Sequence, residues 1–421
     1  MGLGVIGSGV ARVLIHKANS IAQEVGCPVI LKWALDSDVS KKKSSQIPDG
    51  IFTTEASRLL NDPEIDIIIE VIGGQTHALS YIKEALMRGK HVVTANKEVI
   101  ARHGPELFTL AAENKVDIRY EASVGGGIPI ISPFKDDLLA NKILAIHAII
   151  NGTTNYIVTR MATEDADFTT TLKKAQDLGY AEANPANDIE GIDATYKLAI
   201  LATLGFRTKV DPDEIYREGI SRLTSHDFRY AKELGYAIKL LAIAKEEDGS
   251  IQVRVHPAFI PNNLLLAKVD GVFNAIQVEG DLTGRLIFYG RGAGSLPTSS
   301  AVVSDVIHLA RNLRLGNCGR LLPDLSQSKK IMPISDIKTR YYMRLTIADQ
   351  PGVLAHISRV LGDNMISIAS VIQKEADETS QTAEIVIMTH LAQESAVQEA
   401  LREIKALPVV KEIGNLIRVE D

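Results

Sequence analysis

Residues 65–95, IDIIIEVIGGQTHALSYIKEALMRGKHVVTA, decide the fold class of this chain. The β-branched run Ile65–Val71 is typical of a strand that is buried on both faces of a sheet. Residues 77–88 place apolar side chains on one side of a helix, and Gly89 suits its C-terminal end. The run His91–Ala95 then predicts a second strand. A strand, a helix and a strand within about thirty residues indicate a parallel βαβ unit with a right-handed crossover.

The same alternation begins earlier, with a predicted helix over residues 10–25 and a predicted strand over residues 29–35. The fold class is therefore α/β, and we expect residues 1–130 to form a doubly wound, Rossmann-type dinucleotide-binding domain. A helix over residues 295–318 is expected to return to this domain and complete it.

From residue 131 to residue 294 longer helices mix with strands, which predicts a second, α+β domain. We expect its strands and helices at residues 142–150, 169–178, 194–203, 225–246 and 252–258. Residues 319–340 suit a linker, because they carry prolines and serines and little periodicity. Residues 341–421 then read strand, helix, strand, strand, helix, strand, which predicts a βαββαβ ferredoxin-like domain.

The composition excludes several classes of protein. With 421 residues the chain is too long for one core, and 45% apolar and 23% charged residues exclude a disordered polymer. The net charge of −6 gives no basic excess for nucleic acid. No apolar stretch approaches the roughly 18 residues of a spanning helix, so we expect no membrane segment. Two cysteines, Cys27 and Cys318, exclude a disulfide framework and fit a reducing, cytoplasmic setting.

A dinucleotide fingerprint, Gly2-Leu3-Gly4-Val5-Ile6-Gly7, lies near the start of the chain. Its glycines allow a tight turn, the approach of a pyrophosphate and the packing of helix on strand. The candidate cofactor-binding residues are Gly2, Gly4, Val5, Ile6 and Gly7. The fingerprint should follow a strand, yet only Met1 precedes it. We expect the natural chain to begin roughly eight to ten residues upstream, because a sheet without its central strand is badly destabilised.

An acidic residue, Asp36, ends the second predicted strand, where a carboxylate could accept hydrogen bonds from the ribose hydroxyls of NAD. Asp38 is the competing candidate. Lys41, Lys42 and Lys43 could instead pair with the 2′-phosphate of NADP, or form a solvated charge run. The choice between NAD and NADP therefore stays open.

Two further segments follow strands of the first domain. Gly73 and Thr94 are candidate cofactor contacts, and Lys97 is a candidate functional lysine, because open α/β sheets bind ligands at the carboxyl ends of their strands. Glu121 begins a glycine-rich turn whose oxygens could hold a hard monovalent cation. Without other support, this turn only joins two domains.

Residues 179–197, GYAEANPANDIEGIDATYK, are the richest in charged groups that could act in catalysis. Asp193 and Lys197 lie four residues apart at the start of a helix, where a surface ion pair is the simplest interpretation. Alternatively, Lys197 is a proton donor held by Asp193, while Glu182 and Asp188 receive a substrate ammonium group. That arrangement suits reduction of an amino-aldehyde by a nicotinamide cofactor.

Together these segments resemble homoserine dehydrogenase of the regulated bacterial type, which has a C-terminal ACT domain. The most specific motifs are Val93–Lys97, Tyr120–Gly125, Asn151–Asn155, Gly179–Lys197 and Gly292–Thr298. The resemblance implies NAD(P)-dependent, reversible reduction of L-aspartate 4-semialdehyde to L-homoserine in threonine and methionine biosynthesis. It also implies that residues 131–294 bind substrate and pair subunits, so that a homodimer or homotetramer is expected.

The resemblance also implies roles for single residues. Lys197 is similar to the proton donor of the family, Lys97 lies near the nicotinamide and shares that role, and Asp193 resembles the orienting carboxylate. Gly294 is similar to a glycine that meets the cofactor. The implied substrate-binding residues are Glu182, Asp188, Gly152, Thr153 and Tyr180.

In the same family the turn after Glu121 binds sodium or potassium. By resemblance the ion would lie among Glu121 and the main-chain carbonyl groups of Val124, Gly126 and Ile128.

The ACT resemblance rests on residues 349–354, DQPGVL, where a strand turns into a helix and leaves backbone amides open to an amino-acid carboxylate. Threonine is the effector that the resemblance suggests, and a domain that only pairs subunits is the alternative. The candidate effector-binding residues are Asp349, Gly352, Val353 and Leu354.

Two other functions stay open at this point. One is an amino-acid-sensing protein whose dehydrogenase part is inactive because its sheet is incomplete. The other is a dehydrogenase that acts on a different small carbonyl compound, although Glu182 and Asp188 favour a substrate that carries an amine.

Overall fold

The computed structural model describes residues 1–41, 47–48, 50–319, 325, 328–377 and 381–420. The chain divides into two compact units. The first comprises Met1–Ile146, Tyr196–Ile215 and Phe273–Lys329, and the second comprises His147–Thr195, Tyr216–Val272 and Lys330–Asp421. No helix in the described ranges is long and apolar enough to cross a lipid bilayer.

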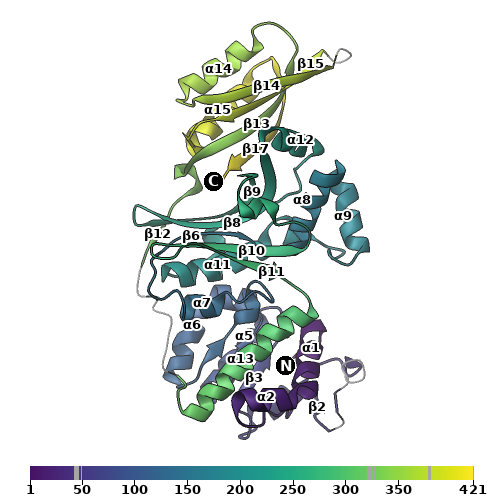
Figure 1. Ribbon diagram of the computed structural model, residues 1–421, viewed down its shortest axis with the longest axis vertical. Helices are drawn as coiled ribbons and strands as arrows, with labels where there is room; N and C mark the ends of the chain where they lie inside the picture. The colour runs from purple at the N-terminus through teal and green to yellow at the C-terminus, as the bar shows by residue number, and fades with distance from the viewer. Residues whose placement is uncertain (42–46, 49, 320–324, 326–327, 378–380, 421) are drawn as a thin grey trace. The chain divides into compact units, whose positions relative to one another are not determined.

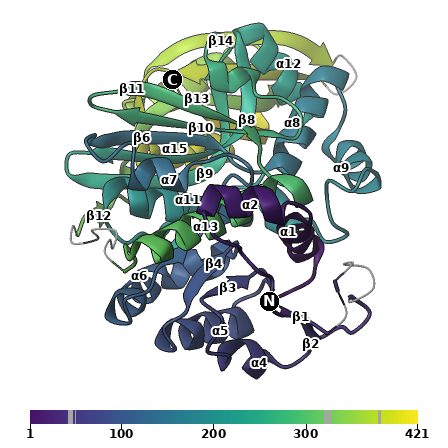
Figure 2. The ribbon, with the colours of Figure 1, turned by 60° about the horizontal axis from the view of Figure 1, so that its bottom comes forward.

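The first unit contains two short parallel sheets with helices on both sides (Figures 1 and 2). Their strands are β1 (Ala34–Leu35), β2 (Phe52–Thr53), β3 (Ile67–Glu70), β4 (His91–Thr94) and β5 (Ile118–Arg119). β1 pairs with β2, and β3, β4 and β5 pair in that order. Because α5 (Thr76–Met87) connects β3 to β4, the βαβ unit predicted from residues 65–95 is confirmed.

The helices of this unit differ in one place from the prediction. The helix expected over residues 10–25 is wrong as a single element, because α1 (Val5–His16) and α2 (Ala18–Val25) are separated at Lys17. The other helices are α4 (Ala56–Leu60), α6 (Lys97–Glu113), α7 (Ile131–Lys135) and the return helix α13 (Ser295–Leu315). Val10 and Leu14 of α1 share a buried apolar cluster with Val302 and Leu309 of α13.

Met1 and Gly2 lie between β1 and β3, and the N-terminus is visible there in Figure 2. Among the described residues, β1 and β2 form one sheet and β3, β4 and β5 form another. The strand expected over residues 29–35 is short, since only Ala34–Leu35 pairs with a neighbour.

An antiparallel ladder also belongs to the first unit. β10 (Phe273–Gly280) pairs with β11 (Gly284–Arg291) along its whole length, and β6 (Ile143–Ile149) begins beside β10. The chain passes from the first unit to the second within β6 and passes back within α11 (Ile192–Phe206).

The second unit is built on a continuous set of strands in the order β8–β9–β17–β13–β15–β14. The helix predicted over residues 225–246 is wrong in its second half. α12 (Ser225–Leu234) ends at Gly235, which has a φ of 82°, and β8 (Tyr236–Glu247) then pairs with β9 (Ser250–Pro261). The other helices before the C-terminal domain are α8 (Gly152–Glu164), α9 (Phe168–Asp177) and α10 (Ala186–Ile189).

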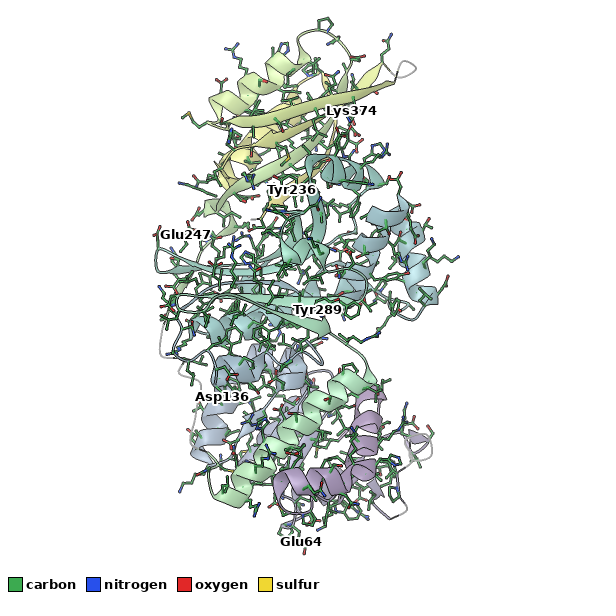
Figure 3. All side chains as sticks on the ribbon, viewed as in Figure 1. Glu64, Asp136, Tyr236, Glu247, Tyr289 and Lys374 are labelled. Atoms are coloured by element: carbon green, nitrogen blue, oxygen red, sulfur yellow. The ribbon has the colours of Figure 1, made fainter. Side chains whose placement is uncertain are left out.

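The βαββαβ order predicted for the C-terminal domain is confirmed. Its elements are β13 (Lys338–Ala348), α14 (Val353–Asp363), β14 (Ile368–Asp377), β15 (Thr382–Thr389), α15 (Glu394–Ala406) and β17 (Val410–Val419). β17 also pairs with β9 in parallel, with Arg418 opposite Ala258. The rings of Tyr236 and Tyr342 both lie against Phe259 at this junction, where Figure 3 labels Tyr236.

Part of the predicted linker lies outside the described residues, namely 320–324 and 326–327. Its described part includes β12 (Lys330–Ile331), which adds to β9, and a short 3-10 turn at Ile334–Asp336.

Candidate active site

The fingerprint loop closes tightly at the start of α1. Gly2 has a φ of 88°, and a Cβ atom there would lie 2.6 Å from the carbonyl oxygen of Val71. A Cβ atom on Gly7 would lie 1.8 Å from the carbonyl oxygen of Gly2. Since only glycine fits at both positions, the loop has the close packing that a pyrophosphate-binding turn requires. Gly4 is the N-cap residue of α1, so Val5 and Ile6 begin the helix.

Asp36 lies directly against this loop. Its Oδ2 atom accepts the backbone N–H of Leu3 at 2.7 Å, and its Oδ1 atom accepts that of Asp38 at 2.9 Å. The carboxylate is therefore fixed at the end of β1 beside the glycines. Lys42 and Lys43 lie outside the described residues.

A pocket of about 310 Å³ opens in the first unit beside this loop. Both candidate lysines, Lys97 and Lys197, line it. The predicted residues Ile6, Gly73, Gly126 and Gly294 also line the pocket. The remaining fingerprint residues, Asp36 and Thr94 are not among its lining residues.

Several other pocket residues were not predicted as site residues, although most of them lie in the sequence motifs that carry the family resemblance. They are Val71, Ile72, Gly74, Ala95, Asn96, Glu98, Ala122, Ser123, Gly292, Ala293 and Thr298. Most are small or apolar and contribute shape and backbone groups, so no chemical signal marks them in the sequence.

Asn96 is the exception, because asparagine directly before a helix is a typical N-cap residue and can be recognised in the sequence. Its Oδ1 atom accepts the N–H of Val99 and its Nδ2 atom donates to the carbonyl oxygen of Gly74 at 2.7 Å. Thr94 lies two residues before Asn96, and its hydroxyl donates a hydrogen bond to the buried carboxylate of Glu70 at 2.6 Å. These bonds fix the start of α6, whose first residue is Lys97.

The turn after Glu121 is held by the carboxylate of that residue. Its oxygens accept the N–H groups of Ile130, Ile131 and Ser132 at 2.6 to 2.8 Å. Because the carboxylate is engaged by three amides, the oxygens that suit a cation here are the main-chain carbonyls of the turn.

Buried charges lie beneath the same turn. The N–H of Glu121 donates to Asp305 on α13 at 2.8 Å. Burial raises the pKa of Asp305 and lowers the pKa of Lys135, whose ammonium group lies 4.1 Å above the ring of Tyr120.

In the second unit, Asn151 links two of the predicted acidic residues. Its Nδ2 atom donates to Asp188 at 2.7 Å and to Asp193 at 2.9 Å, and its Oδ1 atom accepts the N–H of Thr154 as the N-cap of α8. Asn151 and Asp193 are buried, and Asp188 is half-buried. Asn151 was predicted only as part of a motif, although asparagine before Gly-Thr-Thr is a typical N-cap signal.

The other predicted substrate residues lie around this cluster. Gly152 is the first residue of α8, and the hydroxyl of Thr153 donates to the carbonyl oxygen of Tyr180 at 2.7 Å. The ring of Tyr180 lies 5.0 Å from the ring of Tyr156. Glu182 is exposed.

Helix α11 carries the acid and the lysine whose spacing the sequence singled out. Asp193 lies in its first turn, and Lys197 lies four residues further along. Residues at this spacing share one face of a helix.

The predicted effector turn precedes α14 in the second unit. Gly352 is the N-cap residue of α14 with a φ of 91°, and its carbonyl oxygen accepts the N–H of Ala355. Asp349 and Leu354 are exposed and Val353 is buried.

Family models match most of the chain. The model described as homoserine dehydrogenase, NAD binding domain, covers residues 2–121, the homoserine dehydrogenase model covers residues 129–307, and the ACT domain model covers residues 341–409.

Individual relatives extend over the whole chain. The homoserine dehydrogenase of Bacillus subtilis is 40% identical over 420 residues, which cover 100% of this chain and 97% of the relative. The crystal structure of a homoserine dehydrogenase from Thiobacillus denitrificans has a TM-score of 0.94 at 42% identity, over 100% of this chain and 97% of that one. A hyperthermophilic archaeal homoserine dehydrogenase in complex with NADPH has a TM-score of 0.60 at 28% identity, over 73% of this chain and 95% of that one.

Proposed function

This chain belongs to the homoserine dehydrogenase family of oxidoreductases that act on a CH–OH group, and we propose that it reversibly reduces L-aspartate 4-semialdehyde to L-homoserine. The observation that carries the proposal is the pocket that Lys97 and Lys197 line together with Ile6, Gly73 and Gly294. One pocket thus combines the glycine-rich cofactor loops with two cations suited to carbonyl chemistry.

The cofactor is NAD(H) or NADP(H), and it supplies the hydride when it is bound. The loop fits a pyrophosphate because its backbone is close-packed at Gly2 and Gly7. Asp36 lies where a ribose would bind, and its fixed carboxylate favours hydroxyls over a 2′-phosphate. The NADPH complex of the archaeal relative supports a nicotinamide nucleotide in this fold. We propose a preference for NAD.

Lys197 donates the proton that the aldehyde oxygen needs as it becomes the hydroxyl of the product. A cation at this oxygen stabilises the negative charge that develops there. Lys97 takes part in the same step from the start of α6, and Asp193 orients Lys197 from one turn away on α11. Lys97 and Lys197 therefore act on the same atom from two helices.

The substrate ammonium group is bound by Glu182 and Asp188, with Gly152, Thr153 and Tyr180 at the edge of this subsite. Asn151 supports the proposal, because its amide orients the Asp188 carboxylate through a 2.7 Å hydrogen bond. Carboxylates in this subsite attract an ammonium group and disfavour the deaminated aldehyde.

A monovalent cation, sodium or potassium, is bound by the carbonyl oxygens of Glu121, Val124, Gly126 and Ile128. Positive φ values of 73° at Gly125 and 55° at Gly126 support the proposal, because they turn the chain sharply between these carbonyls. The ion would stabilise the turn through these carbonyl oxygens. The Glu121 carboxylate does not take part, because it accepts N–H groups at the start of the following helix.

The C-terminal domain regulates the enzyme by binding threonine at Asp349, Gly352, Val353 and Leu354. The ACT family match and the amides at the start of α14 support this assignment. We assign residues 1–130 with the helix over 295–318 to cofactor binding, residues 131–294 to substrate binding and pairing, residues 319–340 to a linker and residues 341–421 to regulation. The enzyme works as a cytoplasmic homodimer or homotetramer.

The test is the loss of NADH or NADPH absorbance when aspartate 4-semialdehyde is added. The matched control is succinate semialdehyde, which presents the same aldehyde without the amine. We expect turnover with the first compound and a large loss of kcat/KM with the second. Threonine binding without any turnover would identify an amino-acid-sensing protein instead.

A further inference from the structure

Three side chains of types that bind transition metals gather at the amino ends of β4 and β5. They are His91, Asp117 and Cys318, and their ligand atoms all lie within 4.8 Å of one another. His91 is the first residue of β4, Asp117 directly precedes β5, and Cys318 follows the C-terminal end of α13. All three belong to the first unit, so the packing of that unit alone brings them together.

This cluster is separate from the pocket that Lys97 and Lys197 line, because none of its three residues lines that pocket. The pocket lies at the carboxyl ends of the same strands, where Ala95 and Asn96 follow β4. Four residues of β4 separate the two places, which is roughly 13 Å of extended strand. An ion bound in the cluster would therefore not meet the reacting atoms.

The ring of His91 presents a nitrogen lone pair to the cluster. Its Nδ1 atom accepts the backbone N–H of Asp117 at 3.0 Å, so this nitrogen carries no proton. The Asp117 carboxylate lies 4.0 Å from the same nitrogen. An ion on Nδ1 would replace this one hydrogen bond, and its bonds to three ligands outweigh the loss.

The chain beside Cys318 is held against the same carboxylate. The N–H of Gly319 donates to the Oδ1 atom of Asp117 at 3.0 Å. Burial and the negative charge of Asp117 raise the pKa of the Cys318 thiol to about 11, so the thiol keeps its proton while no ion is bound. When an ion binds the thiolate, the displaced proton passes to the buffer.

The cluster is open on one side. The His91 side chain is buried, whereas Asp117 and Cys318 are half-buried. An ion can therefore enter beside Asp117 and Cys318, and water can occupy its fourth position. One nitrogen, one sulfur and one oxygen ligand together favour zinc, because magnesium and calcium prefer oxygen ligands alone.

We propose that His91, Asp117 and Cys318 bind one zinc ion, which joins the chain after α13 to the amino ends of β4 and β5. The site goes beyond the proposed activity, because the ion takes no part in the reduction. Its ligands come from three segments that are far apart in the sequence, so the site exists only in the folded chain. Zinc therefore stabilises the fold of the first unit.

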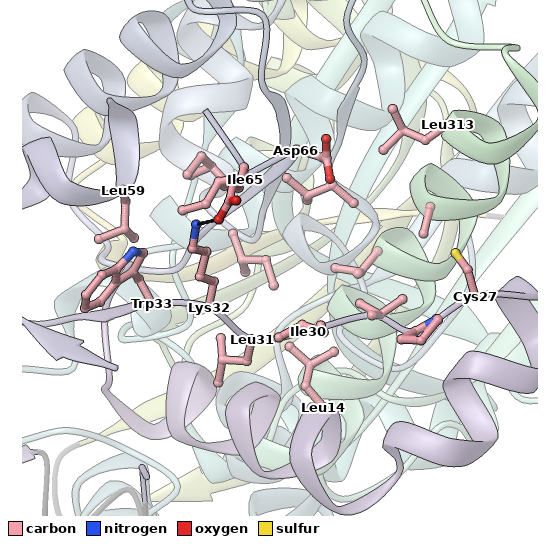
Figure 4. Close-up of a pocket in the computed structure, with 18 of the residues that line it drawn as sticks. Leu14, Cys27, Ile30, Leu31, Lys32, Trp33, Leu59, Ile65, Asp66 and Leu313 are labelled. Carbon is pink, nitrogen blue, oxygen red and sulfur yellow. Dashed lines mark hydrogen bonds and ion pairs between the residues drawn. The ribbon is translucent and has the colours of Figure 1, made fainter. Parts of the chain in front are cut away.

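The experiment measures zinc binding to the full chain after treatment with a chelator and dialysis, with cobalt as a spectroscopic probe. Cobalt bound to a thiolate absorbs in the near ultraviolet, so this band reports whether a cysteine is a ligand. Cys318→Ser removes the sulfur, and His91→Asn removes the ring nitrogen but keeps an acceptor for the Asp117 N–H. Cys27→Ser is the matched control, because Cys27 is the only other cysteine and is exposed beside a different pocket (Figure 4).

The parent chain and Cys27→Ser should each bind one zinc ion and show the thiolate band with cobalt. Their Tm should rise by about 5 °C at a free zinc concentration a hundredfold above Kd. Cys318→Ser should lose the band, and zinc affinity should fall at least about a hundredfold in Cys318→Ser and in His91→Asn. Equal zinc affinity in the parent chain and Cys318→Ser would overturn the proposal, and so would a parent chain without the cobalt band.

A second measurement needs no variant. Iodoacetamide labels the thiols of the parent chain, and mass spectrometry follows the peptides of Cys27 and Cys318 separately. Zinc should slow the labelling of Cys318 at least about tenfold and leave that of Cys27 unchanged. Equal labelling of Cys318 with and without zinc would overturn the proposal even if the variants do not fold. None of these readouts depends on the substrate or on turnover.

Discussion

The guanidinium group of Arg344 on β13 donates through Nε to the Oδ1 atom of Asp227 on α12 at 2.9 Å. Asp227 is fully buried, and it also accepts the N–H of Thr224 to cap α12. Arg344 continues to Glu384 on β15 at 3.1 Å, and Glu384 contacts His226. The C-terminal domain is thus joined to α12 by a buried charged pair.

Replacing Arg344 should therefore destabilise the chain strongly. Arg344→Met leaves the Asp227 carboxylate buried without its cation, which costs about 3 to 5 kcal/mol. Urea unfolding followed by circular dichroism measures this loss. The double variant Arg344→Met/Asp227→Asn should recover most of it, because the buried charge is then gone. A double variant as unstable as Arg344→Met would contradict this explanation.

Lys197→Ala should lower kcat at least about a hundredfold, within the usual range for general acid catalysis. The KM for aspartate 4-semialdehyde should change much less. Lys97→Ala provides the comparison, and its loss should be smaller, since Lys197 still supplies the proton. Steady-state kinetics at saturating cofactor separate the two effects. Unchanged kcat in Lys197→Ala would remove this lysine from the mechanism.

Asn151 should act as a positioning residue. Asn151→Ser keeps an N-cap for α8 but loses the Nδ2 donor shared by Asp188 and Asp193, so KM should rise, and Tm should fall somewhat because the buried Asp193 carboxylate loses a hydrogen bond. Asn151→Ala loses the cap as well and should cost about 1 kcal/mol of stability in addition. If both variants lose stability without a change in KM, the role of Asn151 is only structural.

Asp36 should set the cofactor preference. Asp36→Asn keeps an acceptor for the Leu3 N–H but removes the negative charge that opposes a 2′-phosphate. The ratio of kcat/KM for NADPH to that for NADH should rise about tenfold or more, by analogy with charge contacts of 1 to 2 kcal/mol. Asp38→Asn is the matched control and should leave the ratio unchanged. Equal ratios in all three proteins would show that the discrimination lies elsewhere.

The order of helices and strands in the C-terminal domain was predicted correctly from the sequence, because its short elements have clear periodicity and its first turn carries Gly352. The strand at residues 236–247 was not predicted correctly, because its sequence, YAIKLLAIAKEE, contains good helix formers. Its pairing with β9 stabilises this segment as a strand, and such pairing is a tertiary effect that a local pattern does not contain.

The sequence indicated which residue types would form the candidate site, but not which of them would meet in one pocket. The fingerprint glycines and Lys97 stand at positions that local rules mark. The convergence of Gly73, Lys197 and Gly294 on one pocket follows from the path of the chain, which returns through α13 after about three hundred residues. Asn151 is an intermediate case. Its role as an N-cap residue could be predicted from the sequence, but its hydrogen bonds to Asp188 and Asp193 could not.

The parallel pairing of β17 with β9 limits how the C-terminal domain can be removed. Arg254 on β9 is buried and meets Glu420 at 2.6 Å, just beyond β17. Burial alone would raise the pKa of Glu420, but Arg254 and Lys245 outweigh it and hold the pKa well below its usual range. A protein shortened before residue 341 would lose Glu420, leave the Arg254 guanidinium with its hydrogen bonds to Gln252 and His256, and bare the edge of β9 at Ala258 and Phe259. A shortened protein therefore needs a new polar surface on β9.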